Sequence, residues 1–236
     1  NRSHSYAYSM IAYTTAFLKT YHPAEFLTAL LNSYADKLDE IPKCIDDAKR
    51  KGVKVNTPEF GVSDALCAYA NGTIQYGISL VKHCNTRIAG ELSELGKNTY
   101  SSFVDLLVGL EEKTSINSKQ IEILITLNFF RRFGKNAKLL AVYKATKSGK
   151  TKYDKKHKEA TKQQRLTALY EFESQQEDKS MAVYDQVMSE QEYLGFIVSK
   201  YLHAPSNYAI IISAEKTFAP RVIVYYLQTG EQKTYK

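Results

Sequence analysis

Residues 1–34 read NRSHSYAYSMIAYTTAFLKTYHPAEFLTALLNSY, and this stretch decides the fold class. Its apolar and aromatic side chains recur with the three- to four-residue spacing of an α-helix. Pro23 ends a first helix, for which Ser3 or Ser5 is the expected N-cap, and suits the first turn of a second helix. The first helix is apolar on most sides, which predicts that it is buried or faces a ligand.

The rest of the chain predicts a mainly α fold with small β elements, of the α+β class. Asn71-Gly72 favours a β-hairpin between residues 66–70 and 73–78, because both turn positions require positive φ. Further helices and β segments follow from the apolar spacing and from the turn residues. The expected helices cover residues 39–52, 88–95, 103–107, 116–130 and 181–201, and the expected strands cover residues 53–55, 208–214 and 222–227.

The charge of the chain is concentrated in one segment. The 236 residues carry a formal net charge of +7, with 44% hydrophobic and 24% charged residues. Residues 135–165 hold eleven Lys or Arg and two acids, and the remaining residues are slightly acidic. Such a segment is either a solvated, partly disordered linker or a contact with the DNA phosphate backbone, and a mobile basic linker can be both. No apolar run reaches the roughly 18 residues of a membrane span, so no membrane association is expected.

Catalytic and metal-binding motifs have little support in the sequence. Cys44, Cys67 and Cys84 are odd in number and lack CxxC spacing, which argues against disulfides and zinc and favours a reducing cytosol. The five histidines lie far apart, and the chain has no glycine-rich phosphate loop, GxSxG or HExxH motif. We therefore expect no catalytic and no metal site here. A start at Asn1 without Met or a leader favours an internal segment.

Two cationic clusters allow a structural and a functional interpretation. Arg2-Ser3-His4 lies at the start of a predicted helix, where it either caps the helix or forms a phosphate-binding corner. Arg131-Arg132-Phe133-Gly134-Lys135 follows a predicted buried helix. It is either an ordinary charged surface or a DNA-phosphate contact.

Four motifs near the N-terminus resemble the bacterial replicative DNA polymerase III alpha subunit, a C-family polymerase. They are Asn1-Arg2-Ser3-His4-Ser5-Tyr6-Ala7-Tyr8, Ala12-Tyr13, Phe17-Leu18-Lys19 and Pro23-Ala24-Glu25-Phe26. In that family the corresponding stretch belongs to the fingers, with Lys at the position of Arg2 and Tyr at that of His22. The divergence is also compatible with a phage-type member.

Further segments resemble the same family downstream. Residues 76–82 are similar to the entry of its helix-hairpin-helix, although His83-Cys84-Asn85 replaces the glycine-containing turn. Residues 100–106, 116–134 and 194–199 are similar to later family segments, and the β-rich end falls where an OB-fold would begin. The resemblance therefore implies five segments. They are the end of the fingers (1–55), a β-hairpin connector (56–80), a helix-hairpin-helix region for duplex DNA (81–135), a basic linker with a clamp-binding peptide (136–180), and a helix with the start of an OB-like domain (181–236).

The resemblance implies template-directed DNA synthesis in DNA replication by a nucleotidyltransferase. The Mg²⁺ ions of such a polymerase are held by palm aspartates upstream, so this chain alone would bind no cofactor and be inactive. Contacts with nucleotide or template are implied for the residues Arg2, Ser3, His4, Tyr8 and Lys19. Contacts with duplex DNA are implied for the residues Lys82, Asn117, Lys119, Arg131, Arg132 and Lys135.

The implied partners are primer–template DNA, a deoxynucleoside triphosphate, a sliding clamp and other replisome subunits, in the bacterial cytoplasm and nucleoid or a phage-infected cell. Gln164, Leu166, Leu169 and Tyr170 resemble a degenerate clamp-binding peptide, and they also fit an ordinary amphipathic helix. Two other functions remain open: a non-catalytic DNA-binding protein and a clamp-docking accessory module.

Overall fold

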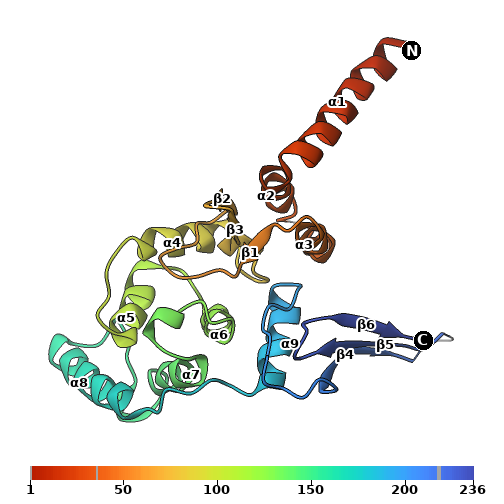
Figure 1. The fold of residues 1–236 in the computed structure, drawn as a ribbon. Helices are drawn as coiled ribbons and strands as arrows, with labels where there is room; N and C mark the ends of the chain where they lie inside the picture. Colours follow the sequence, from red (N-terminus) through yellow and green to blue (C-terminus); the bar gives the residue numbers. More distant parts are fainter. Residues whose placement is uncertain (1, 36, 217–218) are drawn as a thin grey trace. The chain divides into compact units, whose positions relative to one another are not determined.

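The computed structural model describes residues 2–35, 37–216 and 219–236. The chain divides into two compact units, Asn1–Gly96 and Lys97–Lys236. Helices dominate both units and each unit has one three-stranded sheet, so the predicted mainly α fold with small β elements is confirmed (Figure 1). The boundary between the units, after Gly96, falls inside the predicted segment 81–135, and the boundaries of the five predicted segments stay predictions except where corrected below.

The first unit is a set of short helices around a small sheet. Pro23 stands at the first position of its second helix, as predicted, and His22 separates the first two helices. The helical elements of this unit are α1 (Arg2–Tyr21), α2 (Pro23–Ser33), the 3₁₀ turn η1 (Leu38–Glu40), α3 (Ile41–Arg50), the 3₁₀ turn η2 (Ile78–Leu80) and α4 (Thr86–Gly96).

The predicted hairpin forms at Asn71-Gly72. Strands β2 (Ala68–Ala70) and β3 (Thr73–Gln75) pair antiparallel, and Asn71 and Gly72 have φ values of 52° and 77°. Strand β1 (Lys54–Asn56) lies on the other edge of β3 and pairs with it in parallel. The strand at 53–55 was predicted, but its partner was not, because a parallel pairing has no local turn signal.

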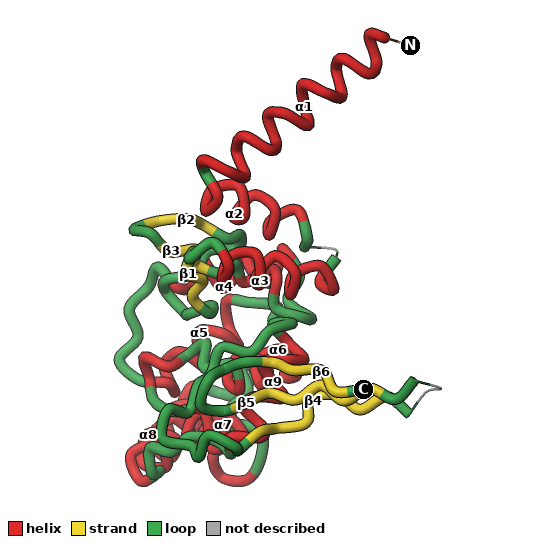
Figure 2. The backbone as a smooth tube through the Cα atoms, turned by 45° about the vertical axis from the view of Figure 1, so that its right-hand side comes forward, coloured by secondary structure: helices red, strands yellow, loops and turns green. Residues whose placement is uncertain are grey.

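Helix α1 differs from the sequence prediction in two respects. Among its residues, all of which the structure describes, none is buried. The first of the two predicted alternatives, a buried helix, is therefore wrong for the chain by itself, and the second, a helix that faces a ligand, stays a prediction. Tyr6 is 70% exposed and Tyr13 is 69% exposed, and α1 extends from its unit without a second layer over it (Figure 2). Ser3 and Ser5 lie within the helix, so neither residue is its N-cap.

The second unit is built on a core of aromatic and aliphatic side chains. Phe103, Phe129 and Phe130 are completely buried, and the ring of Phe130 lies 5.6 Å from that of Phe103 and 5.0 Å from that of Phe129. The helical elements of this unit are α5 (Phe103–Lys113), α6 (Ser118–Thr126), η3 (Arg131–Phe133), α7 (Asn136–Ala145), η4 (Gly149–Thr151), α8 (Glu159–Gln175) and α9 (Val183–Tyr193).

Residues 136–180 are not the basic linker that was predicted, because they contain α7, η4 and α8. The positive charges lie on these helices and on the short turns that connect them, and the segment contributes to the core, as shown by the complete burial of Val142. Some cations also bind neighbouring elements. Lys147 Nζ lies 4.9 Å from the Tyr143 ring centroid, and Lys162 Nζ lies 3.8 Å from Glu112 Oε1. Composition alone therefore overestimated the mobility of this segment.

The predicted clamp-binding peptide is part of α8 and packs into the second unit. Leu169 is 1% exposed. The Tyr170 hydroxyl donates a hydrogen bond to Asp105 Oδ1 at 2.5 Å. The carboxylate of Glu173 accepts the backbone N–H groups of Phe103 and Val104 at the start of α5, at 3.1 and 3.3 Å. These contacts favour the alternative of an ordinary amphipathic helix, because Leu169 cannot fill a partner's pocket while it lies in this core.

The C-terminal part consists of α9 and an antiparallel sheet. The predicted helix over 181–201 is too long, since α9 ends at Tyr193 and Gly195 follows with a φ of 83°. Strands β4 (Ala209–Glu215), β5 (Arg221–Tyr226) and β6 (Gln232–Tyr235) form the sheet in the order β4-β5-β6. Val187 of α9 packs with Tyr225 in a small core of its own. Within the described ranges, no helix is long and apolar enough to cross a membrane.

The three cysteines give the first prediction. Burial raises the pKa of Cys44 and of Cys84 to about 12 and that of Cys67 to about 11. Because the thiolate is the reactive species, all three should resist Ellman's reagent at pH 8 in the native protein and react in urea. Rapid labelling of any one of them without denaturant would contradict the buried positions.

Leu169 gives the second prediction. Leu169→Ala should lower the free energy of unfolding of the second unit by about 2–5 kcal/mol, because it leaves a cavity in the core. Gln164→Ala, in the same helix but exposed, is the matched control and should change it by less than about 0.5 kcal/mol. Both are measured by urea unfolding, and equal stability of the two variants would restore the clamp-binding interpretation.

Candidate nucleic-acid interface

The first candidate contact is the turn over residues 81–85, between η2 and α4. Val81 and Cys84 are buried, and the Cys84 N–H closes the turn by donating to the Val81 carbonyl at 2.9 Å. Lys82 and His83 are exposed at its tip. His83 has a φ of 74°, a conformation that glycine usually supplies. The turn therefore forms without the glycines of the related family.

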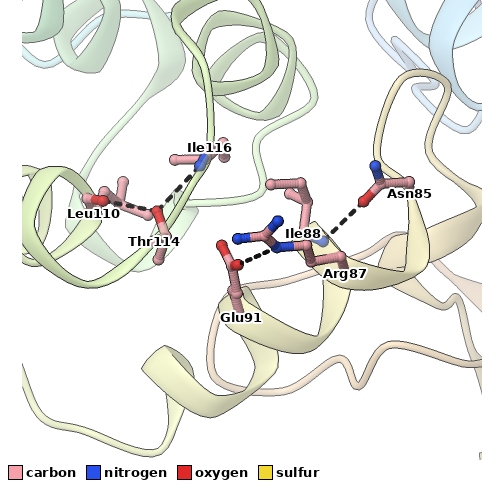
Figure 3. A network of polar contacts seen from close by, with 7 residues as sticks. All are labelled: Asn85, Arg87, Ile88, Glu91, Leu110, Thr114 and Ile116. Carbon is pink, nitrogen blue, oxygen red and sulfur yellow. Dashed lines mark hydrogen bonds and ion pairs between the residues drawn. The ribbon is translucent and has the colours of Figure 1, made fainter.

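The start of α4 lies directly behind this turn. Asn85 caps the helix, since its Oδ1 accepts the Ile88 N–H at 2.9 Å (Figure 3). Arg87, in the first turn of α4, forms an ion pair with Glu91 at 3.0 Å (Figure 3). Arg87 was not among the predicted DNA contacts, although a cation just after a capping Asn was a usable signal. A hollow of about 250 Å³ at this helix start is lined by residues that include Ser79 and His83.

The second candidate contact is the connection between α5 and α6. Thr114 Oγ1 donates to the Leu110 carbonyl at 2.7 Å and accepts the Ile116 N–H at 3.4 Å, which shapes the chain after α5 (Figure 3). Asn117 Oδ1 accepts the Gln120 N–H at 3.0 Å, and Gln120 Oε1 accepts the Asn117 N–H at 2.9 Å. Asn117, predicted to bind DNA, thus has its carbonyl oxygen engaged in a capping box. The predicted Lys119 is exposed in the first turn of α6.

The third candidate contact is the cationic turn, by which we mean Arg131, Arg132 and Lys135. All three are exposed and lie between α6 and α7. The Arg132 guanidinium lies 5.2 Å from the centroid of the Phe133 ring. The backbone N–H of Lys135 donates to Asp178 Oδ1 at 2.7 Å. The turn therefore holds two guanidinium groups and one ammonium group on a short, anchored segment.

The predicted N-terminal residues do not form one cluster on α1. Spacings of 4 and 11 residues put His4, Tyr8 and Lys19 on the same face of the helix, and the rings of His4 and Tyr8 lie 4.5 Å apart. Arg2 lies about 160° around the helix axis from His4. Ser3 is displaced from His4 by about 100° in the opposite sense. The three side chains therefore leave the helix in different directions, and a phosphate-binding corner made by Arg2, Ser3 and His4 stays a prediction.

Lys19 is already paired within its own unit. Its ammonium group lies 2.8 Å from Asp47 Oδ2 of α3. Hydrogen bonding to Lys19 holds the pKa of the Asp47 carboxyl below its usual value. The ion pair fastens the end of α1 to α3 and neutralises part of the charge that was predicted to face a nucleotide.

The described parts of the chain contain no group of three or more His, Cys, Asp or Glu side chains that could hold a metal ion. Their donors therefore do not fit the Mg²⁺ ions that the resemblance implies for the polymerase, and we derive no step through a metal held by these residues.

Comparisons with known proteins agree with these features. The family described as "Helix-hairpin-helix motif" matches residues 52–140. The chain is 34% identical over 136 residues to the DNA polymerase III subunit alpha of Treponema pallidum, covering 57% of this chain and 12% of the relative. It is 34% identical over 145 residues to that of Saccharopolyspora erythraea (60% and 12%) and 33% identical over 144 residues to that of Campylobacter jejuni (59% and 12%).

The chain thus spans about an eighth of the length of these relatives. The three candidate turns described above and their exposed cations lie within residues 52–140, which match the helix-hairpin-helix family. The resemblance seen in the sequence is confirmed: this chain is similar to a segment of the DNA polymerase III alpha subunits, and its residues 52–140 match a helix-hairpin-helix motif.

Proposed function

We propose that this chain binds duplex DNA by its phosphate backbone, as the helix-hairpin-helix part of a replicative DNA polymerase. The observation that carries the proposal is the repeated placement of exposed cations at helix-connecting turns. Lys82 lies at the first turn, Lys119 follows the second, and the cationic turn of Arg131, Arg132 and Lys135 is the third. All of them fall within residues 52–140, which match the helix-hairpin-helix family.

The chemistry of these turns suits phosphate rather than base edges. Lys and Arg side chains and the free N–H groups of a helix start bind phosphate oxygens without reading the sequence. Such contacts release counterions from the duplex, so binding weakens steeply with salt. We therefore expect DNA binding by this region to be independent of sequence, as a polymerase that moves along its template requires.

The basic segment, residues 135–165, adds further positive charge to that of the turns. Lys144, Lys150 and Lys156 are exposed, whereas Lys162 is 3.8 Å from Glu112. Lys144 lies on α7, Lys150 in η4 and Lys156 in a turn before α8, so their charges are carried by folded elements and not by a disordered linker. We infer that these lysines strengthen encounter with DNA, while the cationic turn supplies the closer contact.

We further propose that α1 belongs to the fingers of the polymerase and contacts nucleotide or template. The face with His4 and Tyr8 offers two ring systems for stacking on a base. Arg2 offers a planar guanidinium group for a phosphate near the helix start. The polymerase reaction itself is the attack of a primer 3′-hydroxyl on the α-phosphorus of a deoxynucleoside triphosphate, which forms a phosphodiester bond and releases pyrophosphate. Mg²⁺ would supply charge stabilisation when bound. In this proposal the residues of α1 bind the nucleotide or the template and orient it for the reaction.

The cationic turn gives a direct test. Arg131→Ala/Arg132→Ala/Lys135→Ala should lower duplex affinity by about a hundredfold at 0.15 M salt and reduce the slope of log K against log [salt] by about 2–3, at 0.9 per phosphate contact. The measurement is a fluorescence-anisotropy titration at several salt concentrations.

The matched control removes three cations outside the helix-hairpin-helix match. Lys43→Ala/Lys49→Ala/Arg50→Ala in α3 gives the same change of charge and should leave the salt slope within about 1 of the wild type, because it removes no proposed contact. Equal slopes for wild type and the cationic-turn variant would refute the proposed phosphate contact.

The fingers assignment has its own test in a polymerase that contains this chain. Arg2→Ala should reduce kcat/KM for the nucleotide by about tenfold or more, because a charge-assisted hydrogen bond contributes about 1.5–3 kcal/mol. Lys37→Ala, which removes an exposed cation from the same unit, serves as the control in steady-state primer extension. Unchanged kcat and KM for Arg2→Ala would exclude a nucleotide contact and leave a non-catalytic DNA-binding role.

A further inference from the structure

A network of buried polar side chains extends through the second unit from α9 to the cationic turn. Glu190 is 4% exposed, Gln186 is 5% exposed and Asn136 is 1% exposed. Burying polar groups destabilises a fold unless each finds a partner, and a buried carboxylate is the most demanding of them. Glu190 is hydrogen-bonded to Gln186, and Gln186 is hydrogen-bonded to Asn136, so the three side chains form one connected network.

Glu190 lies at one end of this network of buried polar side chains. Its carboxylate accepts the backbone N–H groups of Val198 and Ser199 at 2.8 and 2.9 Å and also the Ser199 hydroxyl. It accepts the Gln186 Nε2 group at 2.9 Å. All four of these groups are donors, so the oxygens of Glu190 act as acceptors here. Glu190 therefore fixes which end of the Gln186 amide faces it.

The other end of Gln186 then has to face the turn. Its Oε1 accepts hydrogen bonds from Asn136 Nδ2 at 2.6 Å and from Asn128 Nδ2 at 3.2 Å. Asn128 has a φ of 57° at the end of α6, and Asn136 is the first residue of α7. One amide oxygen thus joins the two ends of residues 128–136.

Asn136 is held from further sides. It donates to the Thr126 carbonyl at 3.2 Å, and its Oδ1 accepts the Met181 N–H at 2.9 Å. The cationic turn lies between these two fixed ends, and its three charged side chains are exposed. The backbone that carries them is therefore set by contacts on its buried side.

We propose that Glu190 is a positioning residue for the cationic turn. It orients the Gln186 amide, which holds Asn128 and Asn136 and so presents Arg131, Arg132 and Lys135 to DNA in one geometry. The inference rests on the proposed function, since it concerns phosphate binding by this turn. Glu190 touches no DNA itself, being buried, and acts through Gln186.

The same carboxylate also anchors the C-terminal sheet. Ser199, whose N–H and hydroxyl bind Glu190, accepts the Tyr225 hydroxyl at its carbonyl at 2.6 Å. Tyr225 lies in β5 and packs with Val187 of α9. A change at Glu190 therefore affects the sheet as well, and the experiment has to separate this structural effect from the effect on the cationic turn.

The test is Glu190→Gln, compared with Glu192→Gln, an exposed carboxylate on the same helix. Both remove one negative charge, which by itself favours DNA binding. Glu190→Gln puts an NH₂ group among four donors and releases the Gln186 amide. We expect it to lower duplex affinity by about fivefold at 0.15 M salt and to reduce the salt slope by about 1, the effect of one lost phosphate contact. Glu192→Gln should show neither change.

A double-variant comparison distinguishes positioning from general destabilisation. In the Arg131→Ala/Arg132→Ala/Lys135→Ala background, Glu190→Gln should leave the salt slope unchanged, because the side chains that it positions are gone. A further loss of the same size in that background would overturn the proposal. Gln186→Met keeps the other three donors of Glu190 and should reproduce the lowered slope, so it decides the question if Glu190→Gln does not fold.

The outcomes separate this inference from the proposed function. If the wild type and the cationic-turn variant bind duplex DNA equally, the proposed phosphate contact fails and the positioning role fails with it. If the cationic-turn variant binds more weakly but Gln186→Met and Glu190→Gln keep the slope of the wild type, the phosphate contact stands and only the positioning role is refuted.

Discussion

Burial of Phe129 and Phe130 is the constraint on which the second unit depends. Both side chains are completely buried, and burying one such ring stabilises a fold by about 1.5–3 kcal/mol. Two adjacent side chains can enter the same core here because the chain leaves α6 through Asn128, at a φ of 57°. Arg131 and Arg132 follow at once and are exposed. The aromatic core thus decides where the proposed phosphate contacts lie.

Helix ends tie the charged segment to this core. The first N–H groups of α5 have no partners within the helix, and the Glu173 carboxylate of α8 accepts two of them. Asp105, in the first turn of α5, accepts a hydrogen bond from Tyr170, which lies in α8 like Glu173. A high density of lysine indicated a linker, but the apolar inner face of the helices and these end contacts outweigh the repulsion between the lysines.

Helix α1 shows the opposite relation between composition and burial. Tyr6 and Tyr13 are aromatic and highly exposed. An apolar helix surface indicates that burial would be favourable, but it does not specify the surface that supplies it. The sequence likewise does not specify the partner of a charged side chain. Lys19 pairs with Asp47 because of how α1 meets α3.

The sequence by itself determined two local features of the backbone and the similarity to the DNA polymerase III alpha subunits. Pro23 separates two helices and Asn71-Gly72 makes a hairpin, because each restricts φ at its own position. Only the tertiary structure decided the burial of Leu169 and the pairing of Gln186 with Asn136, residues 50 positions apart. Backbone preferences are set by neighbouring residues, whereas the partner of a buried side chain is set by packing between elements, which no local pattern encodes.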